Sequence, residues 1–175
     1  MSAEILQRAC DGDRDAFGVL IETHYDFIHS VAWRWCGTQV DAEDIAQEAC
    51  IRLGRSIRSF KGQSAFCTWL YALTLNVVRD HQRQSLRRRR DEGRLANDPI
   101  FFQQLEPEND GRGEWLWAAV RLLPEKQRDA VLLVHSEGLS HAAAAEVLDC
   151  SENTVSWHLH EARKRLKDLL KKEAV

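Results

Sequence analysis

Apolar side chains recur every three or four residues through the first eighty positions of the chain. Between residues 13 and 37 the recurring apolar residues are Phe17, Leu20, Ile21, Phe27, Ile28, Val31 and Trp35. This spacing places them on one face of an amphipathic helix. Asp13 is suited to cap the start of that helix, and Gly37 is suited to end it. The pattern therefore predicts a long helix between these two residues.

Two further helices are predicted before residue 90. The first starts at Asp41, with Asp44 three residues later as the acidic member of a capping box. Its buried stripe is Ile45, Ala49, Leu53 and, by extension, Ile57. After a polar loop at 59–64, the second helix runs into the arginines at 87–90. Its apolar stripe is Phe66, Trp69, Leu70, Leu73 and Val77.

The helical period is lost between residues 84 and 113. This stretch contains Pro99 and the sequence EPENDG at 106–111, which is typical of a linker. Beyond it, a helix is predicted from Glu114, and Pro124 fits the first turn of the next helix. Gly138 is suited to end that helix. Ser140 and Ser151 are suited to cap the last two helices.

The predicted fold class is therefore all-α. We expect two small helical domains, residues 1–95 and 112–175, joined by a flexible linker at 96–111. The 9 glycines and 3 prolines in 175 residues are too few for a turn-rich β-fold, and the 44% of hydrophobic residues is enough for packed cores.

Composition also bears on the cellular location of the protein and on whether it holds disulfides, a metal or a cofactor. No run approaches the roughly 20 apolar residues of a membrane span, and no signal peptide opens the chain, so we expect a cytoplasmic protein without membrane insertion. The 5 cysteines are odd in number and form no Cys-x-x-Cys pair. Together with the spacing of the 7 histidines, this predicts neither a disulfide framework nor a metal site, and no cofactor is expected.

Charge is unevenly distributed along the chain. The net charge of −3 argues against general binding to nucleic acid. Residues 81–90, however, contain five arginines and no acidic residue, so this block carries +5. We therefore expect local contacts with DNA.

The last two predicted helices, 140–148 and from 152 onward, are joined by the short turn 149–151. This arrangement predicts a helix-turn-helix, whose second helix can enter a DNA major groove. Rotation at about 100° per residue points several polar side chains away from the core. The candidates for DNA contact that point outward are Asn153, Trp157, His160 and Lys164, flanked by Ser156, Arg163 and Lys167. The alternative is an ordinary helical hairpin with a solvated face.

A second stripe lies on the helix predicted from Asp41. Asp44, Gln47, Glu48 and Ile51 recur at helical spacing, opposite the apolar stripe. An isoleucine among acidic groups suggests a surface that docks a basic protein. The alternative is a solvated face with one exposed apolar residue, which is common.

The loop at 59–64 and the following helix form a third candidate. Lys61, Gln63 and Ser64 lie in the loop, and Asn76, Arg79, Asp80 and Arg83 share one helical face. Amide, basic and aromatic groups together suit unstacked bases. The alternative for the aromatic residues Phe66, Trp69 and Tyr71 is simple core packing, which we favour for the first two.

Two blocks of sequence resemble a known family. The sequence DAEDIAQE at 41–48, FKGQSAFCTWLY at 60–71 and Asn76 resemble region two of the extracytoplasmic-function (ECF, group IV) sigma factors of the sigma-70 family. The sequence LPEKQR at 123–128 and the segment from Gly138 to Arg163 resemble their region four. The resemblance covers about residues 13–84 and 114–170, in the family's order.

The resemblance implies a transcription initiation factor, not an enzyme, that binds core RNA polymerase and promoter DNA. The stripe Asp44, Gln47, Glu48 and Ile51 would dock on the clamp helices of the largest subunit. The minus-ten element would be bound and opened, with one base flipped out, by Phe60, Lys61, Gln63, Ser64, Asn76, Arg79, Asp80 and Arg83. The minus-thirty-five element would be read by Ser151, Asn153, Thr154, Ser156, Trp157, His160, Arg163 and Lys164. An anti-sigma factor is a further expected partner.

One departure from the family concerns the final helix. The family usually carries arginines soon after the Thr-Val pair, where this chain has Ser156, Trp157 and His158. Two other interpretations remain at this point. A different two-domain regulator would share the helix-turn-helix without polymerase docking. A helical metal-dependent nuclease would need paired metal ligands, which the spacing does not supply.

Overall fold

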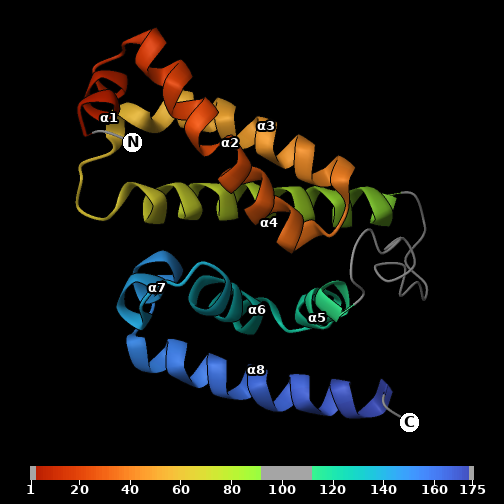
Figure 1. The fold of residues 1–175 in the computed structure, drawn as a ribbon. Helices are drawn as coiled ribbons and strands as arrows, with labels where there is room; N and C mark the ends of the chain where they lie inside the picture. The colour runs from red at the N-terminus through yellow and green to blue at the C-terminus, as the bar shows by residue number, and fades with distance from the viewer. Residues whose placement is uncertain (1–2, 92–111, 174–175) are drawn as a thin grey trace. The chain divides into compact units, whose positions relative to one another are not determined.

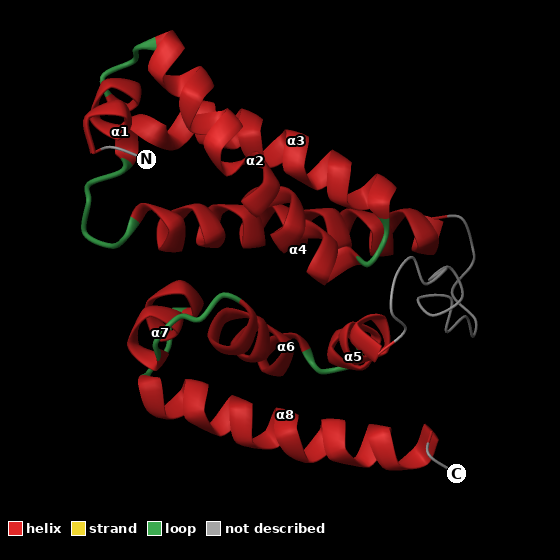
Figure 2. Cartoon of the chain, viewed as in Figure 1, coloured by secondary structure: helices red, strands yellow, loops and turns green. Residues whose placement is uncertain are grey.

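The computed structural model describes residues 3–91 and 112–173, and every regular element within these ranges is helical (Figures 1 and 2). The chain divides into two compact units, one on each side of the central segment. The all-α class with two helical parts is thus confirmed for the described residues. The predicted linker at 96–111 lies outside them.

The N-terminal unit is built from four α-helices and one short 3-10 helix. These are α1 (Ala3–Cys10), α2 (Arg14–Cys36), α3 (Gln39–Ser56), η1 (Ile57–Ser59) and α4 (Phe66–Asp91). Helix α2 packs against α1, α3 and α4, and α3 also packs against α4. Figure 1 shows the C-terminal half of α2 crossing α4. The predicted stripe of Ile45, Ala49, Leu53 and Ile57 is buried in the core of this unit.

The ends of α2 follow the prediction, whereas the start of α3 does not. Asp13 accepts hydrogen bonds from the backbone of Asp15 and Ala16, and Gly37 ends α2 with a φ of 78°. The hydroxyl of Thr38 accepts from the Asp41 backbone N–H at 3.2 Å and donates to the Asp41 carboxylate at 2.7 Å. Helix α3 therefore begins at Gln39, two residues before the predicted start, because Thr38 and Asp41 form the cap between them.

A buried pair of aromatic residues connects α2 to α4. The Trp35 side chain is fully buried, and its indole N–H donates to the Tyr71 hydroxyl over 3.4 Å. Tyr71 is also buried, and Phe66 is only 8% exposed. The core interpretation of Phe66 is confirmed. Trp69 is half-buried, so part of its ring still faces solvent.

The C-terminal unit is a second helical bundle. Its elements are α5 (Arg112–Arg121), α6 (Glu125–Val131), the π-helical turn η3 (Leu132–Ser136), α7 (His141–Leu148) and α8 (Glu152–Glu173). Helices α5, α6 and α7 all pack against α8. Pro124 is the residue before the first turn of α6, so its predicted place inside that turn is wrong by one position. Gly138 follows η3 with a φ of 67°, as expected for the end of the helix.

The turn between α7 and α8 is short because two caps meet in it. The hydroxyl of Ser151 accepts from the Thr154 backbone N–H at the start of α8, as the Ser140 hydroxyl accepts from Ala143 at the start of α7. Asp149 ends α7 in the left-handed conformation, with a φ of 50°. Ala144 of α7 and Ala162 of α8 are fully buried in the core of this unit. None of the described helices is long and apolar enough to cross a membrane.

Candidate nucleic-acid interface

An open hollow of about 500 Å³ lies between the end of α3, η1 and the first turns of α4. One side of the hollow is polar, and the other combines a tryptophan, two aliphatic side chains and an amide. The lining residues are Arg52, Arg55, Ser56, Ser59, Trp69, Ala72, Leu73 and Asn76. An aromatic face, hydrogen-bonding groups and positive charge meet here, and these are the groups that hold an unstacked nucleotide.

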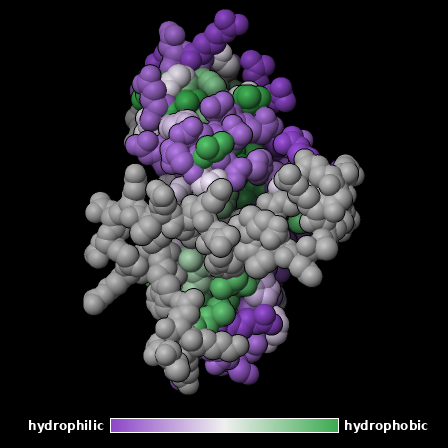
Figure 3. Space-filling model, turned by 90° about the vertical axis from the view of Figure 1, so that its right-hand side faces the viewer, coloured by the Kyte–Doolittle hydropathy of each residue, from purple (hydrophilic) through white to green (hydrophobic). Residues whose placement is uncertain are grey.

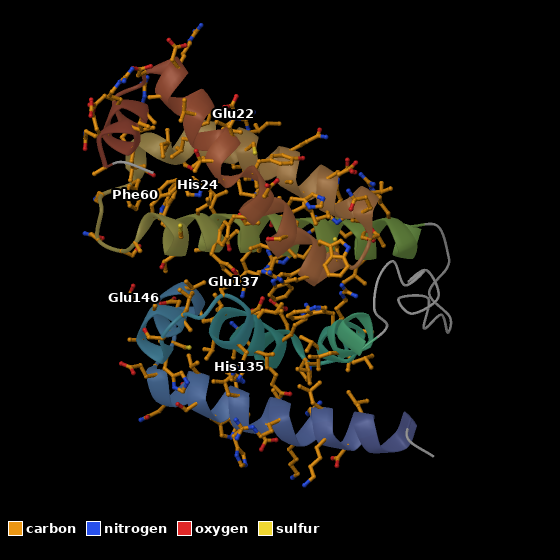
Figure 4. The ribbon with its side chains drawn as sticks, in the orientation of Figure 1. Glu22, His24, Phe60, His135, Glu137 and Glu146 are labelled. Carbon is orange, nitrogen blue, oxygen red and sulfur yellow. The ribbon has the colours of Figure 1, made fainter. Side chains whose placement is uncertain are left out.

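The loop before α4 is held by aromatic packing. The Phe60 ring is half-buried, 5.5 Å from Phe66 and 5.4 Å from Trp69, measured between ring centroids. Figure 4 shows Phe60 and His24 at the same end of the N-terminal unit. Burial lowers the pKa of His24, whose ring is 5.2 Å from Phe66. The sequence-predicted Lys61 and Gln63 are exposed beside this cluster, whereas Ser64 is half-buried.

The predicted face of α4 is only partly open to solvent. Asn76, Asp80 and Arg83 are exposed, whereas Arg79 is half-buried. Asp80 accepts a hydrogen bond from Arg52 of α3 at 2.6 Å. Arg83 approaches the other oxygen of the Asp80 carboxylate at 3.5 Å. The structure thus brings Asn76 and Asp80 next to an arginine that was not among the predicted site residues.

The stripe on α3 is exposed apart from Glu48. Asp44 and Gln47 are exposed, and Ile51 is 49% exposed. Glu48 is half-buried and accepts from Arg52 at 2.8 Å. On the side of the molecule drawn in Figure 3, hydrophilic side chains predominate on the N-terminal unit, with single hydrophobic residues between them. The stripe has this same mixed character.

Arg52 is the functional candidate that sequence reasoning missed. Hydrogen bonds from its guanidinium to Glu48 and Asp80 raise the pKa of Arg52, so its charge is maintained. The spacing of Glu48 and Arg52, four residues apart on one helix, is a signal that could have identified the first contact. The second contact joins residues 28 positions apart, and no local pattern reports it.

The predicted outer face of α8 is open to solvent. Its exposed side chains are Asn153, Ser156, Trp157, His160, Arg163 and Lys164, and Val155, Leu159 and Ala162 are buried beneath them. Trp157 is 57% exposed, which is unusual for so large an apolar ring. Its ring lies 5.0 Å from that of His158, and burial lowers the pKa of His158.

Three polar residues of the helix-turn-helix also bond within the protein. The Ser151 hydroxyl accepts from the Thr154 backbone N–H at 3.1 Å and lies 2.8 Å from the Thr154 hydroxyl. The hydroxyl of Ser156 lies 3.0 Å from Nδ1 of His141, which joins α8 to α7. Ser151 and Thr154 therefore form the cap of α8, in addition to any contact with DNA.

Replacing Ser151 by alanine is expected to lower the free energy of unfolding of the C-terminal unit by about 1 kcal/mol, the usual cost of a lost N-cap. Thermal unfolding of the full chain followed by circular dichroism measures this change. Ser151→Asn keeps a capping oxygen and is the matched control, with a loss well under that of Ser151→Ala. Equal stability of wild type and Ser151→Ala would show that the cap contributes nothing.

Comparison with known proteins gives two family matches in separate parts of the chain. Residues 20–90 match the model of Sigma-70 region 2. Residues 113–166 match the model of Sigma-70, region 4. The first match contains α3, η1, the loop and nearly all of α4, and the second contains the helix-turn-helix.

Characterised relatives match along nearly the whole chain. The ECF RNA polymerase sigma-E factor of Haemophilus influenzae is 30% identical over 175 residues, which covers 94% of this chain and 92% of the relative. The RNA polymerase sigma-H factor of Pseudomonas aeruginosa is 32% identical over 174 residues, covering 93% of this chain and 90% of the relative.

Two solved structures share the fold. The sigma factor RpoE from Bartonella quintana, in complex with the anti-sigma factor NepR, has a TM-score of 0.70 and 23% identity, covering 89% of this chain and 96% of RpoE. CnrH, in complex with the cytosolic domain of CnrY, has a TM-score of 0.69 and 22% identity, covering 96% of each chain. With two family matches in order and relatives at least 30% identical over nine-tenths of its length, this chain belongs to the ECF RNA polymerase sigma factors of the sigma-70 family.

Proposed function

We propose that the two helical units of this sigma factor divide promoter recognition between them. Sigma factors are initiation factors and not enzymes, so the relevant chemistry is binding. In the N-terminal unit, the exposed side chains of Asp44, Gln47 and Ile51, with Glu48 beside them, dock on the clamp helices of the largest polymerase subunit. Acidic groups supply charge complementarity, and the isoleucine supplies apolar area at the centre of the contact.

The minus-ten element is bound at the hollow beside α4. The hollow itself is the observation that carries this assignment, because Trp69 and Asn76 meet basic side chains in a space large enough for one nucleotide. A base flipped out of the duplex stacks on an aromatic ring and is read along its hydrogen-bonding edge. Lys61 and Gln63 lie exposed in the adjacent loop and contact the strand that leaves the hollow.

The minus-thirty-five element is bound by the outer face of α8. The chain lacks arginines directly after Thr154 and Val155, so bidentate contacts to guanine, worth about 1–3 kcal/mol each, are absent at those positions. Affinity there rests on Arg163 and Lys164 at phosphates and on the exposed Trp157. Sequence selectivity is therefore greater at the minus-ten element.

Membership of this family also supports a proposal for how the chain is regulated and where in the cell it acts. The two solved structures of similar fold are complexes, one with an anti-sigma factor and one with the cytosolic domain of CnrY. We infer that this chain is likewise held by an anti-sigma factor until a signal releases it. Because a sigma factor works on core polymerase, the site of action is the cytoplasm.

Asn76→Ala is expected to relax selectivity at the minus-ten element, because the amide is the exposed hydrogen-bonding group on the α4 wall of the hollow. Losing the recognition of one base costs about 1–3 kcal/mol, which corresponds to roughly 5- to 150-fold in discrimination. Initiation by the reconstituted holoenzyme on promoters randomised separately in the two elements measures it.

Lys164→Ala is the comparison in the same assay. A lysine at a phosphate carries charge but little sequence information, so this variant weakens use of all upstream sequences about equally. The proposed division of labour is wrong if Asn76→Ala leaves the minus-ten preference intact while Lys164→Ala changes the upstream consensus.

A further inference from the structure

Arg52 connects the two surfaces of the N-terminal unit that the proposed function uses. Its Nε atom donates to Glu48 at 2.8 Å, on the docking stripe, and its Nη1 atom donates to Asp80 at 2.6 Å, on α4. The same side chain lines the hollow together with Asn76. Arg52 therefore both lines the hollow and forms the ion pair with Asp80 that joins α3 to α4.

Asp80 presents an electrostatic problem for strand binding. It lies four residues after Asn76, on the same helical face, and its side chain is 48% exposed. A free carboxylate at this position would repel the phosphates of a strand entering the hollow. The charge of Arg52, in direct contact with one carboxylate oxygen, cancels this repulsion at short range.

We propose that Arg52 is a positioning residue for the minus-ten strand, which fixes and neutralises Asp80 so that a nucleic-acid phosphate can approach Asn76. This role rests on the proposed function of the hollow. In this proposal, Asp80 holds Arg52 in place and does not contact DNA directly. The Arg52–Asp80 pair, at 2.6 Å, is shorter than another polar approach between the two helices, His81 to Asp41 at 3.7 Å.

Arg83 cannot supply the same effect. Its Nη1 atom lies 3.5 Å from Asp80, and its side chain is 71% exposed, compared with 35% for Arg52. An exposed pair of this kind is weak and is screened by salt. Arg52 is bound through two nitrogens to two carboxylates on two helices, and this fixes its guanidinium beside the hollow.

The test compares holoenzymes that contain wild-type sigma factor, Arg52→Ala, Asp80→Asn and the double variant. The probe is a promoter fragment whose minus-ten region is already single-stranded, and equilibrium affinity is measured at two salt concentrations. Arg14→Ala, which removes an exposed arginine at the start of α2, is the matched control for the loss of one positive charge. Polymerase binding and thermal unfolding of each variant are measured alongside.

We expect Arg52→Ala to weaken fragment binding by about two- to fivefold at low salt, the range for one uncompensated surface charge, and by less at high salt. Adding Asp80→Asn to Arg52→Ala restores most of that loss, and Arg14→Ala changes little. If Arg52 only braced α3 against α4, adding Asp80→Asn would not restore fragment binding, because Asp80→Asn removes the same ion pair. Absence of rescue would therefore overturn the proposal. If Asn76→Ala had no effect, the assignment of the hollow as the minus-ten site would be overturned instead.

Discussion

Replacing Trp35 by alanine is expected to lower the free energy of unfolding of the N-terminal unit by about 3–5 kcal/mol. The Trp35 ring is fully buried between α2 and α4, and its N–H is hydrogen-bonded to Tyr71. Removing it leaves a cavity in the core and deletes the hydrogen bond to the Tyr71 hydroxyl. Since small domains are stable by only about 5–15 kcal/mol, this loss is a large fraction of the stability of the unit and is expected to lower its melting temperature clearly.

Trp157→Ala is the matched control, because the same chemical change is made at a 57% exposed site in the other unit. Its effect on stability is expected to stay within about 0.5 kcal/mol. Differential scanning calorimetry of the full chain measures both variants. Equal destabilisation by the two substitutions would contradict the burial pattern on which the fold description rests.

Asp44→Arg combined with Gln47→Ala is expected to weaken binding to core polymerase by at least tenfold while leaving the chain folded. Both side chains are exposed, so the free energy of unfolding changes by only about 0.5 kcal/mol. At an interface, however, a reversed charge faces a basic partner, and truncation of central contacts costs about 2 kcal/mol or more. Affinity measured with fluorescently labelled sigma factor gives the size of the loss.

Glu22→Arg is the control for charge reversal, since Glu22 is an exposed acidic residue on α2, outside the stripe (Figure 4). It is expected to bind polymerase as wild type does. Unchanged affinity for the Asp44 and Gln47 double variant would show that the stripe is only a solvated face, which is the alternative that its sequence pattern leaves open.

Helices and their faces could be predicted because both depend on residues a few positions apart. The period of apolar side chains located the buried face of α8, and the polar residues opposite it are exposed as expected. Helix ends were predicted where one residue decides them, as with the carboxylate of Asp13 and the left-handed backbone of Gly37. The predicted start of α3 is wrong because Thr38, and not Asp41, is the N-cap: its hydroxyl accepts from the Asp41 backbone N–H.

The hollow could not be predicted, because its walls come from segments separated by a loop. Asn76 was recognised as a polar member of an exposed face, but Arg55, Ser56 and Ser59 gave no signal in the sequence. The contact between Arg52 and Asp80 depends on how α3 lies against α4, and no periodicity within either helix specifies that placement. The packing of Phe60 on Trp69 has the same long-range origin.

The central claim is that this chain gives core RNA polymerase promoter-specific initiation. Run-off transcription tests it directly, with core polymerase, purified sigma factor and a library of genomic fragments from the same bacterium. The account predicts discrete transcripts that are absent with core polymerase alone and that start downstream of a shared pair of elements. It also predicts that these transcripts disappear with Asp44→Arg and Gln47→Ala. Reconstituted holoenzyme that starts no transcript above the level of core polymerase on any fragment would contradict it.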